Sequence, residues 1–434
     1  MSGRTDVCMV VKNQLWNDAR VKKEARSLAD AGLSVTIISR PEEGCPETED
    51  WNGIRVLRVS GSGAFRASLR SMLDGAEGTD EGLRRRVTES IRRNRIKRLL
   101  ADLVHSAVYQ YRLFRHAVRQ KAAVYHAHDL DTLPACAAAS RFTGAALVYD
   151  SHELWLQSVR HLCSTRPLFM KLERLAESVL APRADAVIAV TPGRARVMRE
   201  MYPRMPALCL VPNYPPLSEP SPRSREVRRE LGVSDDSRFL FIYQGVLGLH
   251  RGLEQLVDAC TLLGGLPLHV AIVGHDATGG AIKEYARGRD TGGTLTFHPP
   301  VPSEELPRLT GSADAGLLLF QDSCLNHTLS LPNKLFEYMM SGLPVVASDL
   351  PEIGEIVGKH DCGLLVDASS PESVAVAMRR MASDPAGAGN MGERGHRAAA
   401  ELYTWGVSER ALLGLYSNVT GRDLVREGEE GAEP

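Results

Sequence analysis

The 434-residue sequence lacks any pattern of paired cysteines: its eight cysteines are scattered, without a Cys-x-x-Cys pair or a His/Cys cluster at zinc-ligand spacing. It also lacks net charge, because 52 lysines and arginines nearly balance 53 aspartates and glutamates. No apolar run could span a bilayer, and the N-terminal residues lack the parts of a signal peptide. These absences argue against a disulfide scaffold, a metal site, a nucleic-acid binder and a membrane-spanning protein. We therefore expect a cytoplasmic protein.

What the sequence does contain is a regular alternation. Short β-branched strands alternate with amphipathic segments along almost the whole chain, which indicates parallel sheets covered by helices. We predict strands at VCMVV, SVTIIS, IRVLRVS, VYHAH, ALVYD and AVIAV in the first half, and at FLFIYQG, LHVAIVG, TLTFH, AGLLLF, LPVVAS and GLLVD in the second. The Pro- and Ser-rich segment 212–225 interrupts this pattern and predicts an interdomain linker. We predict an α/β protein with two doubly wound domains, 1–215 and 216–402, that face each other across a cleft. The acidic tail, 420–434, is expected to be disordered.

The segment SLPNKLFEYMMSGLPVVASDL, residues 330–350, predicts a helix that Pro332 opens and Gly342 closes, followed by a buried strand. Lys334 lies in the first turn, where the positive end of the helix dipole disfavours a cation unless an anion lies in front of it. Glu337 follows one turn later beside an apolar face. A cation and a carboxylate side by side suggest a ligand that carries both an anion and hydroxyl groups.

Two other turns of the second half carry glycines. FLFIYQGVLGLHRGLEQL places Gly245 and Gly248 before a helix and Arg251 at its start, and the strand HVAIV ends in Gly274. Two cations at helix N-termini beside glycine loops match a pyrophosphate, and a carboxylate can accept both hydroxyls of a ribose. We therefore predict a nucleoside diphosphate ligand. A nucleotide hydrolase is disfavoured, because the chain has no G-x-x-x-x-G-K-[ST] loop.

The first half ends two strands in polar clusters. VYHAHDLDTLP brings His128 and Asp129, and VYDSHELW brings His152 and Glu153. Strand alternation turns His126 and His128 to the same side. We expect the cluster to line a cleft. A buried hydrogen-bond network and a metal site are the alternatives, although the spacing matches no recognised ligand motif.

A basic segment breaks the rhythm of the first half. From Arg84 to Arg98 the chain holds eight basic residues against one glutamate. The helical pattern then continues through Leu99, Leu100, Leu103, Val104, Ala107, Val108 and Tyr111. We predict a long amphipathic helix over 84–111 with a core-facing stripe and a solvated basic face. The alternative is a peripheral contact with anionic lipid headgroups at the inner face of the membrane.

Taken together, these motifs resemble the family 4 glycosyltransferases of GT-B fold. The resemblance rests on PNKLFEYMMSGLPVVASDLPEI, GVLGLHRGLEQLVDA, IVGHD, VYHAHDLDTLPA, VYDSHELW and NDARVKKEARSLADAGLSVTIIS, and it extends to about Val419. Residues 403–419 resemble the final helix of that fold, which crosses back to the N-terminal domain. The family implies retaining transfer of a sugar from a nucleoside-diphosphate donor, without a metal or another cofactor.

The resemblance also implies residue roles. Arg251 and Lys334 would bind the diphosphate and neutralise the leaving group, Glu337 would hold the ribose, and His128 would contact the donor sugar as a catalytic residue. The remaining donor-side residues would be Gly245, Gly274, Pro300, Val301, Asn326, His327, Ser330 and Asn333. The acceptor-side residues would be Asn13, Asp18, Asp129, His152 and Glu153.

The sequence departs from the family pattern at two positions. Leu329 stands where many members carry the first of two glutamates, and Val246 stands where many carry a second basic residue. Polar neighbours or backbone must then meet the donor-sugar hydroxyls, and Lys334 can supply the missing charge. The donor is expected to be UDP- or GDP-linked.

Other functions are consistent with the same motifs. A non-hydrolysing sugar-nucleotide epimerase could use this fold and ligand, and a catalytically silent nucleotide-binding homologue is a second alternative. A nicotinamide-dependent dehydrogenase is disfavoured, because VVKNQLWND lacks the G-x-G-x-x-G turn. The acceptor could be a glycan, a lipid-linked saccharide or a small molecule, and the sequence carries no signal for an oligomeric state.

Overall fold

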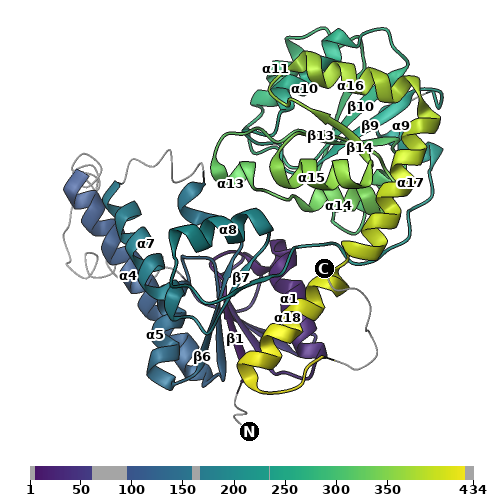
Figure 1. The fold of residues 1–434 in the computed structure, drawn as a ribbon. Helices are drawn as coiled ribbons and strands as arrows, with labels where there is room; N and C mark the ends of the chain where they lie inside the picture. Colours follow the sequence, from purple (N-terminus) through teal and green to yellow (C-terminus); the bar gives the residue numbers. More distant parts are fainter. Residues whose placement is uncertain (1–4, 61–94, 159–166, 234, 426–434) are drawn as a thin grey trace. The chain divides into compact units, whose positions relative to one another are not determined.

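The computed structural model describes residues 5–60, 95–158, 167–233 and 235–425. The chain divides into two compact units (Figure 1). The first contains Met1–Leu156, Arg160–Val211 and Glu409–Pro434, and the second contains Gln157–Val159 and Pro212–Ser408. Both are α/β, and the parallel sheets predicted from the sequence are confirmed. None of the helices in the described ranges is both long enough and apolar enough to cross a bilayer.

An eight-stranded sheet in the order β3-β4-β2-β1-β5-β6-β7-β8 forms the centre of the first unit. Its strands are β1 Val7–Val10, β2 Val35–Ser39, β3 Thr48–Trp51, β4 Ile54–Arg58, β5 Val124–His128, β6 Ala146–Ser151, β7 Ala186–Ala189 and β8 Leu208–Leu210. All neighbours pair in parallel except the edge pair β3 and β4. The sequence analysis missed both edge strands, β3 and β8.

Helices cover both faces of this sheet. They are α1 Ala19–Asp30, α4 Arg95–Gln120, α5 Leu133–Thr143, α7 Pro167–Leu180, α8 Pro192–Met201 and α18 Trp405–Thr420, with single 3-10 turns at Leu15–Asn17, Trp155–Gln157 and Ala181–Arg183. The chain crosses from β1 to β2 in one direction and from β4 to β5 in the other. Right-handed crossovers in opposite directions put α1 and α4 on opposite faces. Figure 1 shows α1 and α18 on one side of the sheet and α4, α5 and α7 on the other.

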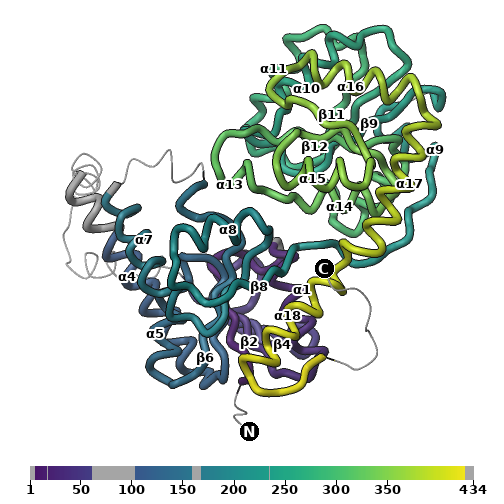
Figure 2. The backbone as a smooth tube through the Cα atoms, viewed as in Figure 1, coloured from purple at the N-terminus to yellow at the C-terminus, as the bar shows by residue number. Residues whose placement is uncertain are grey.

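Six parallel strands form the sheet of the second unit, in the order β11-β10-β9-β12-β13-β14. The strands are β9 Phe239–Gln244, β10 Leu268–Val273, β11 Leu295–His298, β12 Ala315–Leu318, β13 Val345–Ser348 and β14 Gly363–Val366. The helices are α9 Arg225–Glu230, α10 Leu253–Leu262, α11 Ala281–Arg287, α12 Leu306–Thr310, α13 Leu325–Thr328, α14 Asn333–Met340, α15 Pro351–His360, α16 Pro371–Ser383 and α17 Pro385–Leu402. Figure 2 traces this order along the chain.

Two apolar cores sandwich the second sheet. Leu240 and Ile242 of β9 point into one core, and Phe239, Phe241 and Tyr243 of the same strand point into the other. This alternation is expected of a central parallel strand buried on both faces. The sheet is therefore rigid, and loops at the carboxyl ends of its strands have a fixed base.

The long helix expected over 84–111 differs from the structure in its buried stripe. Residues 84–94 lie outside the described residues, and α4 continues to Gln120. Among the side chains described for this helix, 103–120, the buried ones are Tyr109, Leu113 and Ala117, whereas Ala107 is exposed and Val104 and Tyr111 are 47% and 58% exposed. The core-facing stripe predicted from the sequence is therefore wrong at Val104, Ala107 and Tyr111. The sequence is apolar on more than one side of the helix, and the apolar pattern alone did not identify which side packs.

Candidate functional site

In the second unit, the predicted glycine loops meet at the ends of β9 and β10. Gly245 and Gly274 both have positive φ angles, of 122° and 152°. A Cβ on Gly274 would lie 1.8 Å from the carbonyl oxygen of Gly245, and a Cβ on Gly245 would lie 2.3 Å from Nζ of Lys334. Only glycine allows this approach, so the lysine side chain lies directly against the loop backbone.

Lys334, in the first turn of α14, lies on an aromatic ring. Its Nζ is 4.3 Å from the ring centre of Tyr243 and donates to the Tyr243 hydroxyl at 3.3 Å. Burial and, secondarily, the positive charge of Arg251 lower the pKa of Lys334 to about 7, although Glu337 acts in the opposite direction. The ammonium is desolvated and lacks a full set of hydrogen-bond partners, and a bound anion would offset the free-energy cost of this desolvation.

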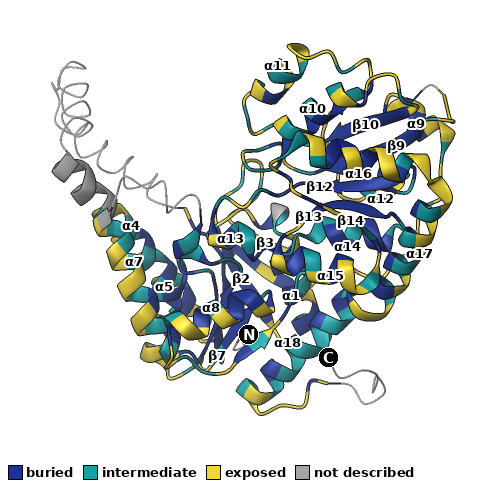
Figure 3. Cartoon of the chain, turned by 45° about the horizontal axis from the view of Figure 1, so that its top comes forward, coloured by how far each residue is buried: buried dark blue, intermediate teal, exposed yellow. Residues whose placement is uncertain are grey.

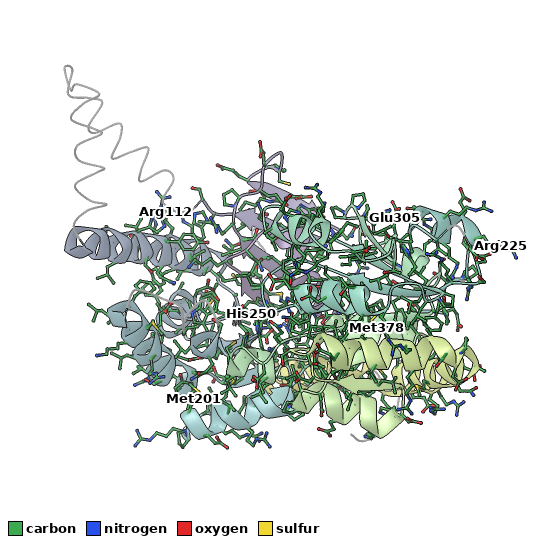
Figure 4. The ribbon with its side chains drawn as sticks, turned by 90° about the horizontal axis from the view of Figure 1, so that it is seen from above. Arg112, Met201, Arg225, His250, Glu305 and Met378 are labelled. Atoms are coloured by element: carbon green, nitrogen blue, oxygen red, sulfur yellow. The ribbon has the colours of Figure 1, made fainter. Side chains whose placement is uncertain are left out.

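Arg251 is held in a similar way. It precedes α10, and its guanidinium lies 4.1 Å from the ring centre of Phe320. Burial lowers its pKa, and Nη1 is buried without a hydrogen-bond partner in the described structure. A buried unpaired donor on a cation points to a ligand or water as its partner. Its neighbour in the loop, His250, has a φ angle of 60° and is labelled in Figure 4.

Glu337 is oriented by a chain of hydrogen bonds. The side-chain amide of Gln244 donates to Glu337 Oε2 at 2.6 Å, and the Thr310 hydroxyl donates to Gln244 Oε1 at 2.7 Å. The backbone N–H of Gln244 donates to the Tyr338 hydroxyl at 3.0 Å, which ties α14 to the end of β9. Because Gln244 and Thr310 are buried and Glu337 is only half-buried, the carboxylate is fixed from behind.

The residues expected around the donor sugar form a compact turn at α13. Ser323 Oγ lies 2.7 Å from Nδ1 of His327, and Ser330 donates to the His327 carbonyl at 2.7 Å. Asn326 and Leu329 are almost fully buried. The ring of His327 lies 6.2 Å from that of Phe320 between centres. This turn therefore adjoins the aromatic ring that supports Arg251.

The other donor-side residues take simpler places. Asn333 begins α14 and is half-buried, Pro300 is exposed in the loop after β11, and Val301 packs partly against the apolar core. The second unit thus brings together Gly245, Gly274, Arg251, Lys334 and Glu337 through close contacts and mutual charge effects.

In the first unit, a buried ionic network lies at the ends of β5 and β6. Arg20 of α1 donates to both oxygens of Asp150 at 3.0 Å, to the Val211 carbonyl at 2.6 Å, and pairs with Glu24 at 2.9 Å. Burial would raise the pKa of Asp150, but Arg20 and His152 outweigh it and hold that pKa well below its usual range. Burial raises the pKa of Glu24 to about 8. Arg20 therefore keeps the Asp150 carboxylate ionised, whereas it offsets the effect of burial on Glu24 only in part.

His152 fixes the tautomer of His128. His152 Nε2 lies 2.9 Å from Asp150 Oδ2 and 3.0 Å from His128 Nδ1. Since an ionised carboxylate can only accept, His152 Nε2 carries a hydrogen, and we infer that His128 Nδ1, which also lies 3.4 Å from Asp150 Oδ2, turns its lone pair toward that hydrogen. His128 then carries its own hydrogen on Nε2, a buried atom without a hydrogen-bond partner in the described structure. Burial lowers the pKa of His128, which keeps the ring neutral.

Asp129 completes the support of His152. Asp129 has a φ angle of 63°, accepts the backbone N–H of His152 at 3.0 Å, and has its other oxygen 3.5 Å from His152 Nδ1. Burial would lower the pKa of His152, but Asp129 and Asp150 outweigh it and raise that pKa to about 10. His152 is therefore an imidazolium held between two carboxylates.

Of the three interpretations of this cluster, burial favours the hydrogen-bond network. His126 and His128 stack with ring centres 4.2 Å apart, on the same side as strand alternation predicts, and both are essentially inaccessible. His126 Nδ1 shares a hydrogen bond of 2.8 Å with the Tyr416 hydroxyl of α18. His152 and Asp129 keep 18% and 22% of their side chains exposed, and Glu153 is half-buried, so these three residues reach the surface while both stacked histidines lie beneath it.

The remaining acceptor-side residues come from the segment between β1 and α1 and from the loop after β6. Asp18 caps α1 by accepting the Val21 N–H at 3.0 Å, and it also accepts the side-chain amide of Asn13 at 2.6 Å. Asn13 is exposed, and Glu153 is half-buried after β6. Asp18 is therefore held in place by its helix rather than free to rearrange.

Among the described residues, one group could offer metal ligands. Donor atoms of Glu24, His126, His128 and Asp150 lie within 4.8 Å of one another. Arg20 already pairs with both carboxylates, and a second cation among them would be repelled. This donor set does not fit a metal ion.

Two family models match the chain. The Glycosyl transferase 4-like domain matches residues 18–214, and the Glycosyl transferases group 1 model matches residues 224–398. The chain belongs to the family 4 glycosyltransferases of GT-B fold. Almost all residues of the two polar clusters described above, one in each unit, lie inside these matches.

Named relatives agree with this membership. The glycosyltransferase is 25% identical over 434 residues to the D-inositol 3-phosphate glycosyltransferase of Kineococcus radiotolerans, covering 94% of this chain and 91% of the relative. It is 27% identical over 330 residues to the alpha-maltose-1-phosphate synthase of Mycolicibacterium smegmatis, covering 69% of this chain and 80% of the relative.

Solved structures share the fold of this glycosyltransferase. Sucrose-phosphate synthase from Thermosynechococcus elongatus superposes with a TM-score of 0.73 at 17% identity, over 96% of this chain and 100% of that one. Anabaena HepE in complex with UDP superposes with a TM-score of 0.67 at 13% identity, over 95% and 100%.

Several site residues of this glycosyltransferase were missed from sequence. Gln244 and Thr310 behind Glu337, and Arg20, Glu24 and Asp150 beneath the histidines, were not predicted. A glutamine that ends the otherwise apolar strand FLFIY is a signal that could have been used, since a polar side chain there needs a partner. For Arg20 and Asp150, 130 positions apart, the sequence contains no such signal.

Proposed function

We propose that this glycosyltransferase moves a sugar from a UDP- or GDP-linked donor to a glycan, lipid-linked or small-molecule acceptor with retention of configuration. The observation that carries the proposal is the pair of desolvated cations, Arg251 and Lys334, that lie on aromatic rings beside the glycine loop. A diphosphate would supply the anionic partner that both cations need. The UDP complex of the structurally similar HepE supports a nucleotide donor.

In the proposed reaction, negative charge grows on the departing diphosphate, and Arg251 and Lys334 stabilise it. Glu337, held by Gln244, accepts hydrogen bonds from the ribose hydroxyls. The resemblance to the family assigns His128 to the donor sugar, and this role requires its buried Nε2 hydrogen to become accessible when the donor binds. The acceptor attacks the sugar on the same face from which the diphosphate leaves, and the leaving phosphate assists this attack. The configuration of the sugar is therefore retained. The proposal needs neither a metal nor another cofactor.

The test begins with the donor. Ligands that bind the native state raise the unfolding temperature, so a thermal-shift screen with UDP- and GDP-sugars should identify the donor. The anomeric configuration of the product, read by NMR, tests retention. Arg251→Ala should lower turnover roughly a hundredfold while donor binding falls less, and turnover within about threefold of wild type would count against the role.

One observation favours a second candidate. Leu329 is buried where many family members carry a glutamate, which fits a silent homologue that binds nucleotide without transfer. Donor binding without a product on any acceptor would support that reading. Incubation with donor alone tests the epimerase, because only an epimerase would form a sugar isomer without an acceptor.

The acceptor and the location are also proposals. The names of two relatives contain a phosphorylated small molecule, which supports a small-molecule acceptor. We propose a cytoplasmic location with a peripheral membrane contact through residues 84–111. Residues 84–94 are outside the described structure, so this contact rests on their basic sequence.

A further inference from the structure

Exposed apolar side chains in the first unit gather on three helices. Nine large hydrophobic residues of its described part are exposed, and seven of them lie on α4, α5 and α7. These seven, here called the apolar face, are Val104, Tyr111, Phe142, Leu168, Leu172, Leu175 and Val179. A monomeric soluble protein rarely concentrates its exposed apolar residues on one side, so this face calls for an occupant.

The clearest part of the apolar face is a stripe along α7. Leu168, Leu172, Leu175 and Val179 follow one another at intervals of four, three and four residues, which puts them on one side of the helix. The stripe is roughly 16 Å long. Each of the four side chains is at least 40% exposed. This helix is apolar on the side that faces away from its own sheet.

The charges of α7 divide between its two sides. Glu177 is buried and accepts hydrogen bonds from the hydroxyls of Tyr149 and Tyr202, at 2.8 and 2.6 Å. Glu173 is half-buried and accepts from the indole of Trp155. Lys171 and Arg174, by contrast, are exposed, and at about 100° per residue both lie on one flank of the leucine stripe, Lys171 beside it and Arg174 further round the helix. Both acids are thus used inside the unit, and the outward side combines apolar and positive groups.

The neighbouring helices continue the same character. Phe114 of α4 packs against Phe142 of α5 with ring centres 6.0 Å apart, and α5 in turn contacts α7. Residues 103–120 and 133–143 contain no aspartate or glutamate, and their exposed cations are Arg115, Arg119 and Arg141. Figure 3 shows the exposed sides of α4 and α7 along the same flank of the unit, and Figure 4 labels Arg112 on α4.

We propose that the apolar face is a docking surface for an anionic lipid membrane, with α7 lying in the plane of the headgroups. Leucines that enter the acyl boundary and cations that remain at the phosphates are the two contacts that a helix in this position makes. The exposed cations beside the apolar face come from three helices, α4, α5 and α7, and a continuous layer of lipid phosphates can meet all of them together, whereas a protein partner would need a separate acid opposite each one. The inference does not depend on the reaction that the chain catalyses.

The test measures sedimentation of the full-length protein with lipid vesicles. Wild type should sediment with vesicles of phosphatidylglycerol and phosphatidylcholine, less so as salt rises, and weakly with phosphatidylcholine alone. Leu172→Ser with Leu175→Ser should lower the partition coefficient roughly a hundredfold, since each buried leucine contributes roughly tenfold. Lys171→Glu with Arg174→Glu should remove the preference for phosphatidylglycerol.

A matched control changes an equally exposed apolar and basic pair elsewhere. Val376→Ser with Arg380→Glu, on α16 of the second unit, should leave vesicle binding unchanged. All these side chains are exposed, so the unfolding temperatures of the variants should equal that of wild type. Wild type that stays in the supernatant with phosphatidylglycerol vesicles at low salt overturns the proposal. A leucine variant that binds vesicles normally but turns a dimer into a monomer also overturns it and assigns the face to a second copy.

Discussion

Binding of a nucleotide sugar should take up a proton at Lys334. The pKa of this lysine is about 7 in the free protein, so at pH 8 about one molecule in eleven carries the ammonium charge. A diphosphate in contact with the side chain favours the charged form and raises its pKa. Raising the pH from 6 to 8 should therefore weaken donor binding about tenfold, which corresponds to about 1.4 kcal/mol.

Isothermal titration calorimetry can measure both quantities. Titrations with UDP-glucose and GDP-mannose identify the better donor, whose esterified diphosphate does not itself titrate in this pH range. Repeating them at pH 8 in two buffers of different ionisation enthalpy gives the number of protons taken up, expected to approach one. Lys334→Arg keeps its charge at every pH and should bind with little pH dependence. Equal wild-type affinity at pH 6 and pH 8, without proton uptake, would refute the reasoning.

Three further outcomes are expected. Lys334→Met should raise the unfolding temperature by several degrees at pH 6 and by less at pH 9. Because the pKa of Lys334 is lowered in the folded protein, the buried charged lysine destabilises the fold below pH 7, and this destabilisation becomes smaller as the pH rises above 7. An unchanged unfolding temperature at pH 6 would contradict this. Gln244→Leu should weaken UDP binding about tenfold but binding of 2′-deoxy-UDP less, since Glu337 loses a charged hydrogen bond; equal losses for both nucleotides would contradict a ribose role. His152→Ala should move the His128 hydrogen from Nε2 to Nδ1, as read from ¹⁵N shifts, and an unchanged tautomer would show that another group sets it.

Much of the fold could be predicted from the sequence because its strands are apolar on both faces. Twelve strand segments named from sequence correspond to strands of the two sheets, and the helix from Pro332 to Gly342 appears as α14 with Pro332 as its N-cap. The missed strand β3, TEDW, is polar and half-exposed at a sheet edge, and β8 has only three residues. Neither has the apolar content on which the prediction relied.

The candidate site could also be predicted only in part. Glycines, cations and the carboxylate that follow strands were identified because the ends of parallel strands meet at one edge. The aromatic rings beneath Arg251 and Lys334 were not identified, since Phe320 and Tyr243 look like ordinary core residues in sequence. The network beneath the histidines includes Arg20, which comes from a helix 130 positions before its partner Asp150. Such long-range pairs have no local pattern.

The last helix of the chain has a consequence for biosynthesis. Tyr416 of α18 is fully buried in the first unit against His126, although the whole second unit separates it in sequence from the strands it packs on. The ribosome makes these residues after the whole second unit, so the first unit cannot close its core until α18 has been synthesised, while the second unit can fold earlier. A gene fragment that stops at Val211 would encode every strand of the first sheet and still leave a hole where α18 belongs.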